Sequence, residues 1–398
     1  MVGNKSDYKK AAKEIWTLLI NSQNEDGGFP PYPGFITISG TIATTDFVSL
    51  LFRPPDIKGI IKNSKVADRV CEKAKVFILR KQWLDGGFVP DGDVYGIKEV
   101  SFVESTANSI VALLTYLRQK TNSEDQYIIK LSIIYGIKYL LEKRDEKREM
   151  WPTYETAKRE DSNFRFFPFI LALRSLVLFV DLYKELNFSK FVDKNFINNI
   201  IGVIKSGTWK IEKELSDKKV LPFSLSSPEK HSLVNTISAI EVLLSIVKSK
   251  EININPIDKI KKSIQDEISF ILENAQLPED HMDDDVILLN IPGYPSQYTA
   301  TYRADMAISY VFSNILKDLK YIYEEENLRN QKLVEIKNYV ENVLNEEIKK
   351  MEENSQYWVE ERRVGRFVPA TSSTCLLLAT IKNYMSWEGD KTNGKQNS

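Results

Sequence analysis

Hydrophobic residues recur along this chain at the three-to-four-residue spacing of helices, and strand patterns are scarce. Odd-numbered helical segments carry charge on one face, whereas even-numbered ones are nearly continuous apolar runs that open with small polar residues. A helix that is apolar all round is buried, and one with a single apolar face lies at the surface. The pattern predicts twelve long helices, over residues 8–22, 43–53, 65–83, 102–119, 124–144, 162–186, 190–206, 228–249, 255–275, 297–324, 328–354 and 370–386.

This alternation predicts an all-α fold, an α/α toroid in which six helical hairpins form an α6/α6 double ring with an apolar inner ring. Connections from odd to even segments are long, and long irregular loops in a compact domain are usually functional or disordered. We expect these loops on one face, around the mouth of a central cavity. Residues 1–387 are expected to form one toroid domain, and the polar residues 388–398 a flexible tail.

One phrase, Gln-x-x-Asp-Gly-Gly-Phe, occurs twice, at residues 23–29 and 82–88. Internal repeats of this kind indicate copies of one structural unit. Glycine permits a positive φ after a helix, the glutamine amide can satisfy backbone groups, and the phenylalanine can pack on the next unit. We therefore interpret the phrase as a structural link between units. Weaker echoes bring the count to six units and lie at 150–152, 207–209, 274–276, 354–356 and 365–369.

The phrase and the Thr/Ser-opened apolar helix after it resemble the repeat of the terpenoid cyclase and protein prenyltransferase superfamily. The resemblance covers essentially the whole chain and implies a toroid that binds or converts an apolar isoprenoid in its central cavity. The cyclase motif Asp-x-Asp-Asp is missing, and its nearest match is Asp283-Asp284-Asp285. The Asp-x-Cys spacing of the prenyltransferase zinc site is also missing, so such a site is not expected. A Cys375–His231–aspartate set is left open, and magnesium would accompany a bound diphosphate.

Within this hypothesis, the candidate catalytic acids are Asp283, Asp284, Asp285 and Asp305. Neighbouring carboxylates can raise one another's pKa, although an acidic triplet on a loop can equally be a solvated cluster. Arg303 and Asp305 can alternatively form a structural ion pair. Arginine forks suit diphosphate or carboxylate groups, or can pair with glutamates of their own loop. The candidate ligand-binding residues are Asn108, Tyr302, Arg303, Arg362, Arg363 and Arg366.

Other polar side chains are expected at the cavity mouth because they lie at the starts of inner helices or in long loops. They are Asp46, Glu104, Arg165, His231, Asn235, Thr371 and Ser373.

The composition of the chain limits the compartments and the classes of partner that are expected. The chain has 398 residues and a net charge of −1, without the basic excess of a nucleic-acid binder. Its two cysteines, Cys71 and Cys375, lie in apolar helical contexts and are predicted to be core thiols in a reducing compartment. No signal-peptide pattern or membrane-spanning run is found, so we expect a soluble cytoplasmic protein and leave peripheral membrane contact open.

Two further functions belong to other classes. A non-catalytic toroid would serve as a scaffold for a protein or peptide partner. A carbohydrate-active toroid would stack sugars on loop aromatics, for which the candidates are Trp151, Tyr154, Trp209, Tyr294 and Trp358.

Overall fold

The computed structural model describes most of the chain. The described residues are 5–34, 38–51, 64–90, 101–120, 126–153, 161, 164–218, 221–274, 287–289, 298–300, 304–363 and 366–394.

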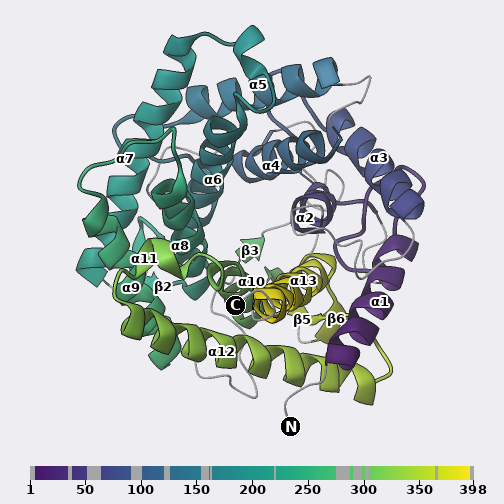
Figure 1. The fold of residues 1–398 in the computed structure, drawn as a ribbon. Helices are drawn as coiled ribbons and strands as arrows, with labels where there is room; N and C mark the ends of the chain where they lie inside the picture. The colour runs from purple at the N-terminus through teal and green to yellow at the C-terminus, as the bar shows by residue number, and fades with distance from the viewer. Residues whose placement is uncertain are drawn as a thin grey trace.

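Two concentric rings of helices form the molecule (Figure 1). The outer ring contains α1 (Lys5–Asn21), α3 (Ser64–Arg80), α5 (Gln126–Lys143), α7 (Lys194–Lys218), α9 (Ile257–Asn274) and α12 (Glu326–Glu353). The inner ring contains α2 (Thr41–Leu51), α4 (Val103–Gln119), α6 (Phe166–Leu182), α8 (Leu233–Lys248), α10 (Ala304–Ile315) and α13 (Thr371–Gly394). The predicted α/α toroid is therefore confirmed. No helix in the described part of the chain is both long enough and apolar enough to cross a membrane.

Inner and outer helices differ as their sequences predicted. In α6, thirteen of the seventeen residues are buried, among them Phe169, Leu173 and Val180. In α9, only the residues of one stripe are buried, and they include Ile260, Ile264 and Ile268. The apolar faces of both rings meet in one continuous core. Each unit can bury its apolar face only against its neighbours, which makes the ring one cooperative structure.

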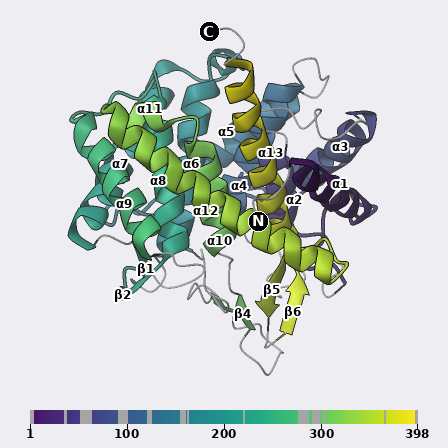
Figure 2. The same cartoon turned by 60° about the horizontal axis from the view of Figure 1, so that its bottom comes forward.

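The chain is not all-helical, because short strands form on the face where the inner helices begin. Strands β1 (Pro222–Ser224) and β2 (Ser227–His231) form one antiparallel pair. A four-stranded antiparallel sheet contains β3 (Ile287–Leu289), β4 (Tyr298–Ala300), β5 (Glu360–Arg363) and β6 (Arg366–Pro369). Figure 2 shows β4, β5 and β6 together at the end of the ring opposite the C-terminus. We call this side the loop face.

Several predicted boundaries were wrong. Helix α7 continues to Lys218, so residues 207–209 lie inside a helix and are not a loop copy of the repeat. Helix α8 begins at Leu233, since the residues expected to start it at 228 form β2. The segment 297–324 divides into β4, α10 and a short α11 (Leu319–Ile322). Helix α13 extends beyond Trp387 to Gly394, into the segment expected to be a flexible tail.

The repeated phrase links successive units as predicted. The Gln23 amide Nε2 donates to the carbonyl of Gly27 at 2.9 Å and to that of Val70, on the next outer helix, at 2.8 Å. Gln82 repeats both bonds, to Gly86 and Ser132, at 2.8 Å each. The phrase therefore ties each loop to the following unit.

The glycines of the phrase are needed because the next helix lies against them. Gly27 and Gly86 have φ of +94° and +88°, and a Cβ on Gly86 would lie 2.7 Å from the carbonyl oxygen of Tyr135. Other residues strongly disfavour this backbone conformation. Asp85 completes the turn, since its Oδ1 accepts from the Gly87 N–H at 2.9 Å and from the Ser101 hydroxyl at 2.8 Å.

A threonine hydroxyl then fastens each of four loops to its inner helix. Thr44 Oγ1 accepts the Phe29 N–H at 2.9 Å, and Thr106 Oγ1 accepts the Phe88 N–H at 2.8 Å. Leu221 with Thr236 and Val359 with Thr374 form the same bond at 3.0 Å. We call this contact the threonine clamp. It shows that Val359, rather than Phe367 of the 365–369 echo, occupies the phenylalanine position in the last unit.

A single type of contact also closes the ring. Thr41, the first residue of α2, donates its hydroxyl to the carbonyl of Val89 in the following loop at 2.9 Å. Thr371, the first residue of α13, donates to the carbonyl of Pro30 at 2.6 Å. Because Phe29 and Phe88 are equivalent clamp residues, Pro30 and Val89 are equivalent too. The last unit therefore joins the first as neighbouring units join elsewhere.

We predict that Gly86→Ala lowers the free energy of unfolding by about 2–4 kcal/mol, because it adds a positive-φ penalty and a backbone clash. Gly202→Ala is the matched control, since its Cβ would meet nothing within 4 Å inside α7. This control is expected to raise stability by about 0.5–1 kcal/mol. Urea denaturation followed by circular dichroism measures both changes. Equal effects of the two variants would contradict the role of Gly86.

We predict that Thr106→Val costs about 1–3 kcal/mol, because the buried Phe88 N–H loses its acceptor. Thr106→Ser keeps the oxygen and should cost about 0.8 kcal/mol for the lost methyl group. Chemical denaturation of the two variants tests this difference. A serine variant as unstable as the valine variant would show that packing, and not the hydrogen bond, makes the clamp important.

Candidate functional site

A central cavity of about 100 Å³ lies on the axis of the ring and is lined by residues from all six inner helices. Nine of its seventeen lining residues are polar or charged: Asp46, Glu104, Asn108, Arg174, Ser238, Glu241, Tyr310, Ser372 and Ser373. The isoprenoid hypothesis implies an apolar cavity lining, and the observed lining contradicts that expectation. Apolar residues of the inner helices pack mainly between the rings, while a narrow stripe of each helix faces the axis.

The lining residues form layers that the repeat explains. Five inner helices begin after Gly40, Phe102, Arg165, Ser232 and Ala370. In each helix, the second and the sixth residues after this position form part of the cavity wall. The first layer contains Ile42, Glu104, Phe167, Val234 and Ser372, and the second contains Asp46, Asn108, Leu171, Ser238 and Leu376. Four residues of helix separate the layers by about 6 Å.

Asp46 is a carboxylate whose protonation is strongly affected by its place in the cavity wall. Burial raises its pKa to about 6, although a hydrogen bond to Ser372 and the charge of Arg174 act in the opposite direction. The side chain keeps partial accessibility because it faces the cavity. A carboxyl group with such a pKa can hold and release a proton near neutral pH.

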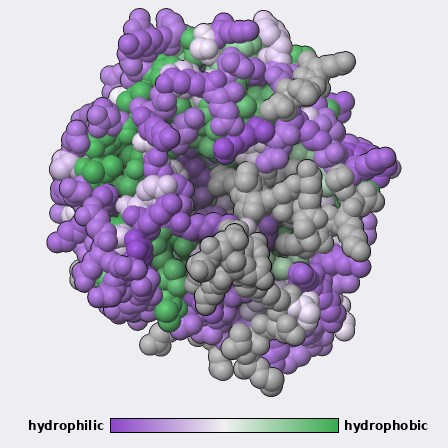
Figure 3. Space-filling view, viewed as in Figure 1, coloured by the Kyte–Doolittle hydropathy of each residue, from purple (hydrophilic) through white to green (hydrophobic). Residues whose placement is uncertain are grey.

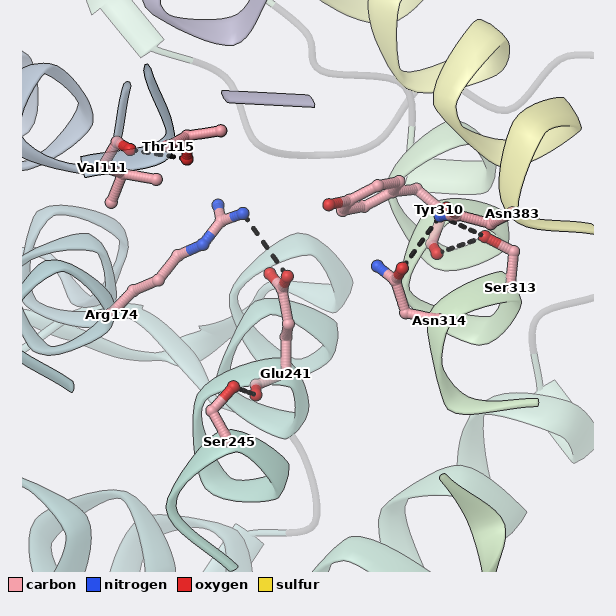
Figure 4. Close-up of polar contacts among 9 residues, drawn as sticks. All are labelled: Val111, Thr115, Arg174, Glu241, Ser245, Tyr310, Ser313, Asn314 and Asn383. Carbon is pink, nitrogen blue, oxygen red and sulfur yellow. Dashed lines mark hydrogen bonds and ion pairs between the residues drawn. The ribbon is translucent and has the colours of Figure 1, made fainter. Parts of the chain in front are cut away.

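Arg174 and Glu241 form the floor of the cavity. Arg174 is the ninth residue after Arg165, and Glu241 is the ninth residue after Ser232. The two side chains therefore start at the same depth along the axis, about 4.5 Å below the layer of Asp46. Arg174 Nη2 lies 3.4 Å from Glu241 Oε1, and Figure 4 shows Tyr310 pointing toward the same space. The Arg174 Nε–H is buried and has no hydrogen-bond partner among the described residues. This orphan donor is available to a bound molecule or water.

Of the predicted site residues, only Asn108 is placed in the cavity lining. Asp305 lies half-buried in the first turn of α10 and is not one of the described lining residues. Tyr302, Arg303 and the triplet Asp283–Asp285 lie outside the described residues.

Arg362, Arg363 and Arg366, which were predicted to bind an anionic group, lie on a β-hairpin and not on an irregular loop. Arg362 and Arg363 belong to β5 and Arg366 to β6, where Arg363 and Arg366 are cross-strand partners. For these residues only the backbone is described. The strands place them on the loop face, beside β4, through the pairing of Ala300 with Arg363.

Both cysteines are buried core thiols, as predicted. Burial and the nearby charge of Asp46 hold the pKa of Cys375 well above its usual range, so the thiol stays protonated. The side chain of His231 in β2 lies outside the description. Among the described residues, no group of three or more His, Cys, Asp and Glu side chains is arranged to hold a metal ion.

Three of the aromatic residues proposed to stack sugars lie within the described residues, and all three pack in or against the hydrophobic core. Trp151 is fully buried, with Nε1 donating to the carbonyl of Leu140 at 2.5 Å. Trp209 and Trp358 are partly buried against the core. Tyr154 and Tyr294 lie outside the described residues.

The sequence analysis placed Asp46, Glu104 and Ser373 at the mouth but missed Arg174, Glu241 and Tyr310. A signal was present, because Arg174 and Glu241 are isolated charges within long apolar runs. They are also 67 residues apart, which is one repeat. Charges at equivalent repeat positions of neighbouring inner helices are expected to meet beside the axis.

Comparisons with solved structures agree with the fold. The chain superposes on an α-1,6-mannanase from a Salegentibacter species with a TM-score of 0.63 and 10% identity, over 96% of this chain and 99% of the other. A cellobiose 2-epimerase from Spirochaeta thermophila gives 0.60 and 10%, over 95% and 98%. An unsaturated glucuronyl hydrolase from Streptococcus agalactiae gives 0.60 and 12%, over 97% and 94%. No family model and no curated protein sequence matches the chain.

We predict that Asp46 makes the protein less stable as pH rises through about 4 to 6. The folded-state pKa of about 6 lies above the ordinary value of 3.8, so the folded state binds the proton more tightly in this window. A shift of this size corresponds to about 3 kcal/mol at pH 7, relative to pH below 4. Urea denaturation of the wild type and of Asp46→Asn across pH 4–7 should show the variant gaining relative stability as pH rises. A pH-independent difference between the two proteins would contradict the shifted pKa.

Proposed function

We propose that this protein is a carbohydrate-active α/α toroid that binds a saccharide in the central cavity and hydrolyses a glycosidic bond. The observation that carries this proposal is the carboxyl group of Asp46, with a pKa of about 6, in a cavity that also contains Glu104. Two carboxyl groups with different environments are what glycoside hydrolysis requires.

In this mechanism, Asp46 donates its proton to the glycosidic oxygen as the bond to the anomeric carbon breaks. Glu104 accepts a proton from the water molecule whose oxygen forms the new bond to that carbon. Asp46 and Glu104 lie on the neighbouring helices α2 and α4, one layer apart. The reaction consumes one water molecule, and a proton exchange with solvent restores both carboxyl groups.

The polar cavity favours a saccharide over an isoprenoid. An apolar ligand would desolvate Asp46, Glu104 and Arg174 without offering them any hydrogen bond, at a cost of several kcal/mol. Sugar hydroxyl groups can supply such bonds. The solved structures of similar fold include the mannanase, the epimerase and the glucuronyl hydrolase, and an inactive variant of the mannanase was solved with α-1,6-mannotetrose.

We predict that Asp46→Asn and Glu104→Gln each reduce turnover by about 10²–10⁴-fold, which is the usual contribution of a positioned acid or base. Reducing-sugar release from cellobiose, α-1,6-mannobiose and unsaturated glucuronyl disaccharides measures the activity. In the wild type, kcat/KM should fall above about pH 6, because Asp46 must be protonated to act.

Asn198→Gln, on the exposed surface of α7, is the control and should leave turnover unchanged. Turnover of farnesyl diphosphate without turnover of any sugar would overturn the proposal. Full sugar hydrolysis by Asp46→Asn would instead overturn the assignment of the acid.

A further inference from the structure

A second chamber opens on the axis of the ring, at the end opposite the loop face. Its volume is about 430 Å³, within the usual range of small-molecule sites. Its lining includes Thr115, Leu178, Ser245 and Asn383. Each of them is the thirteenth residue after the one that immediately precedes its inner helix. They form a layer one turn beyond Arg174 and Glu241. The face seen in Figure 3 is hollowed near its centre, and hydrophilic residues border much of the hollow.

The Arg174–Glu241 pair divides the second chamber from the central cavity. Glu241 lines both spaces, whereas Arg174 lines only the central one. In Figure 4, the pair lies between Thr115 on one side and the Ser313, Asn314 and Asn383 group on the other. The two chambers therefore share one axis and, apart from Glu241, have different lining residues.

The wall of the second chamber is mainly polar and offers several hydrogen-bond acceptors. Eleven of its fourteen lining residues are polar or charged. The hydroxyls of Thr115, Ser245 and Ser313 donate to carbonyls of their own helices, those of Val111, Glu241 and Tyr310, at 2.7–2.9 Å. Each hydroxyl proton is thereby committed, and the oxygen lone pairs remain to accept bonds from a ligand.

The amide groups have a fixed arrangement that adds to this wall. Asn383 Nδ2 donates to Ser313 Oγ at 3.2 Å and to Asn314 Oδ1 at 2.8 Å. These bonds leave the Asn383 oxygen as an acceptor and the Asn314 nitrogen as a donor. A ligand that matches the wall must therefore carry several O–H donors together with oxygen acceptors.

The cations at the rim already have partners. Arg118 Nε lies 3.1 Å from Glu185, and Lys248 Nζ lies 2.5 Å from Asp318. Lys317 Nζ donates to the Ser386 hydroxyl at 2.8 Å. A free anion would have to compete with these contacts, whereas a neutral polyhydroxyl ligand would not.

We propose that the second chamber is a binding site for a neutral saccharide, separate from the central cavity. Hydroxyl groups of the sugar donate to Thr115, Ser245 and Asn383, and the Asn314 amide donates to a ring or hydroxyl oxygen. The site does not depend on whether the central cavity hydrolyses glycosides, because it uses none of the proposed catalytic residues.

The test is calorimetric titration of the full chain with cellobiose and with α-1,6-mannobiose, in an Asp46→Asn background that lacks the proposed acid. We expect Ser245→Trp, which fills the chamber, to weaken binding of at least one disaccharide by tenfold or more. Asn314→Leu should weaken it about three- to tenfold, since one hydrogen bond contributes roughly 0.5–1.5 kcal/mol. Asn198→Trp, on the exposed outer face of α7, should change nothing.

Three results would overturn the proposal. The first is disaccharide binding that Ser245→Trp and Asn314→Leu leave unchanged, which would place the sugar elsewhere. The second is binding of inorganic phosphate without binding of either disaccharide, which would make the chamber an anion site. The third is no binding of any of the three probes. Circular dichroism checks that each variant is folded. If Ser245→Trp does not fold, the titration of Asn314→Leu decides between these outcomes.

Discussion

The threonine clamp is the contact on which the toroid depends. A loop that returns from an outer to an inner helix must satisfy its buried N–H groups, and an unpaired one costs about 1–3 kcal/mol. In four units a threonine hydroxyl accepts this N–H. In three of them, those of Thr44, Thr236 and Thr374, the hydroxyl also donates to the carbonyl four residues earlier. The clamp thereby fixes the depth at which these four inner helices start. The positions of their residues along the axis follow from that depth.

Once the starting depths are fixed, equivalent residues meet across neighbouring units. Arg174 with Glu241, Lys184 with Glu251 and Lys248 with Asp318 are separated by 67 to 70 residues, close to one repeat. The two pairs nearer the surface, Lys184–Glu251 and Lys248–Asp318, contribute little stability each. Their regular spacing shows instead that the repeat controls which charges become neighbours. The repeat therefore positions the polar groups of the axis as well as the core.

The axis of the ring carries two environments with different chemistry. The central cavity concentrates carboxylates beside an arginine, and desolvation there raises the pKa of Asp46. The second chamber presents hydroxyl oxygens whose protons are already donated to helix carbonyls, together with the side-chain amides of Asn314 and Asn383. The first environment suits proton transfer and the second suits binding of hydroxyl groups. Both are more polar than the isoprenoid hypothesis required, and both agree with a carbohydrate ligand.

The amino-acid sequence by itself determined the double ring, the identity of inner and outer helices, and the structural role of the repeated phrase. It could do so because helical periodicity and glycine stereochemistry are local properties that a single chain displays directly. Only the tertiary structure decided the site. Asp46, Glu104, Arg174 and Glu241 come from four different helices, and each faces the axis because it lies on the narrow stripe of its helix that lines the cavity. That selection depends on where each helix starts. The predicted start of the eighth helical segment, at residue 228, was wrong because a strand pair occupies the residues before Leu233.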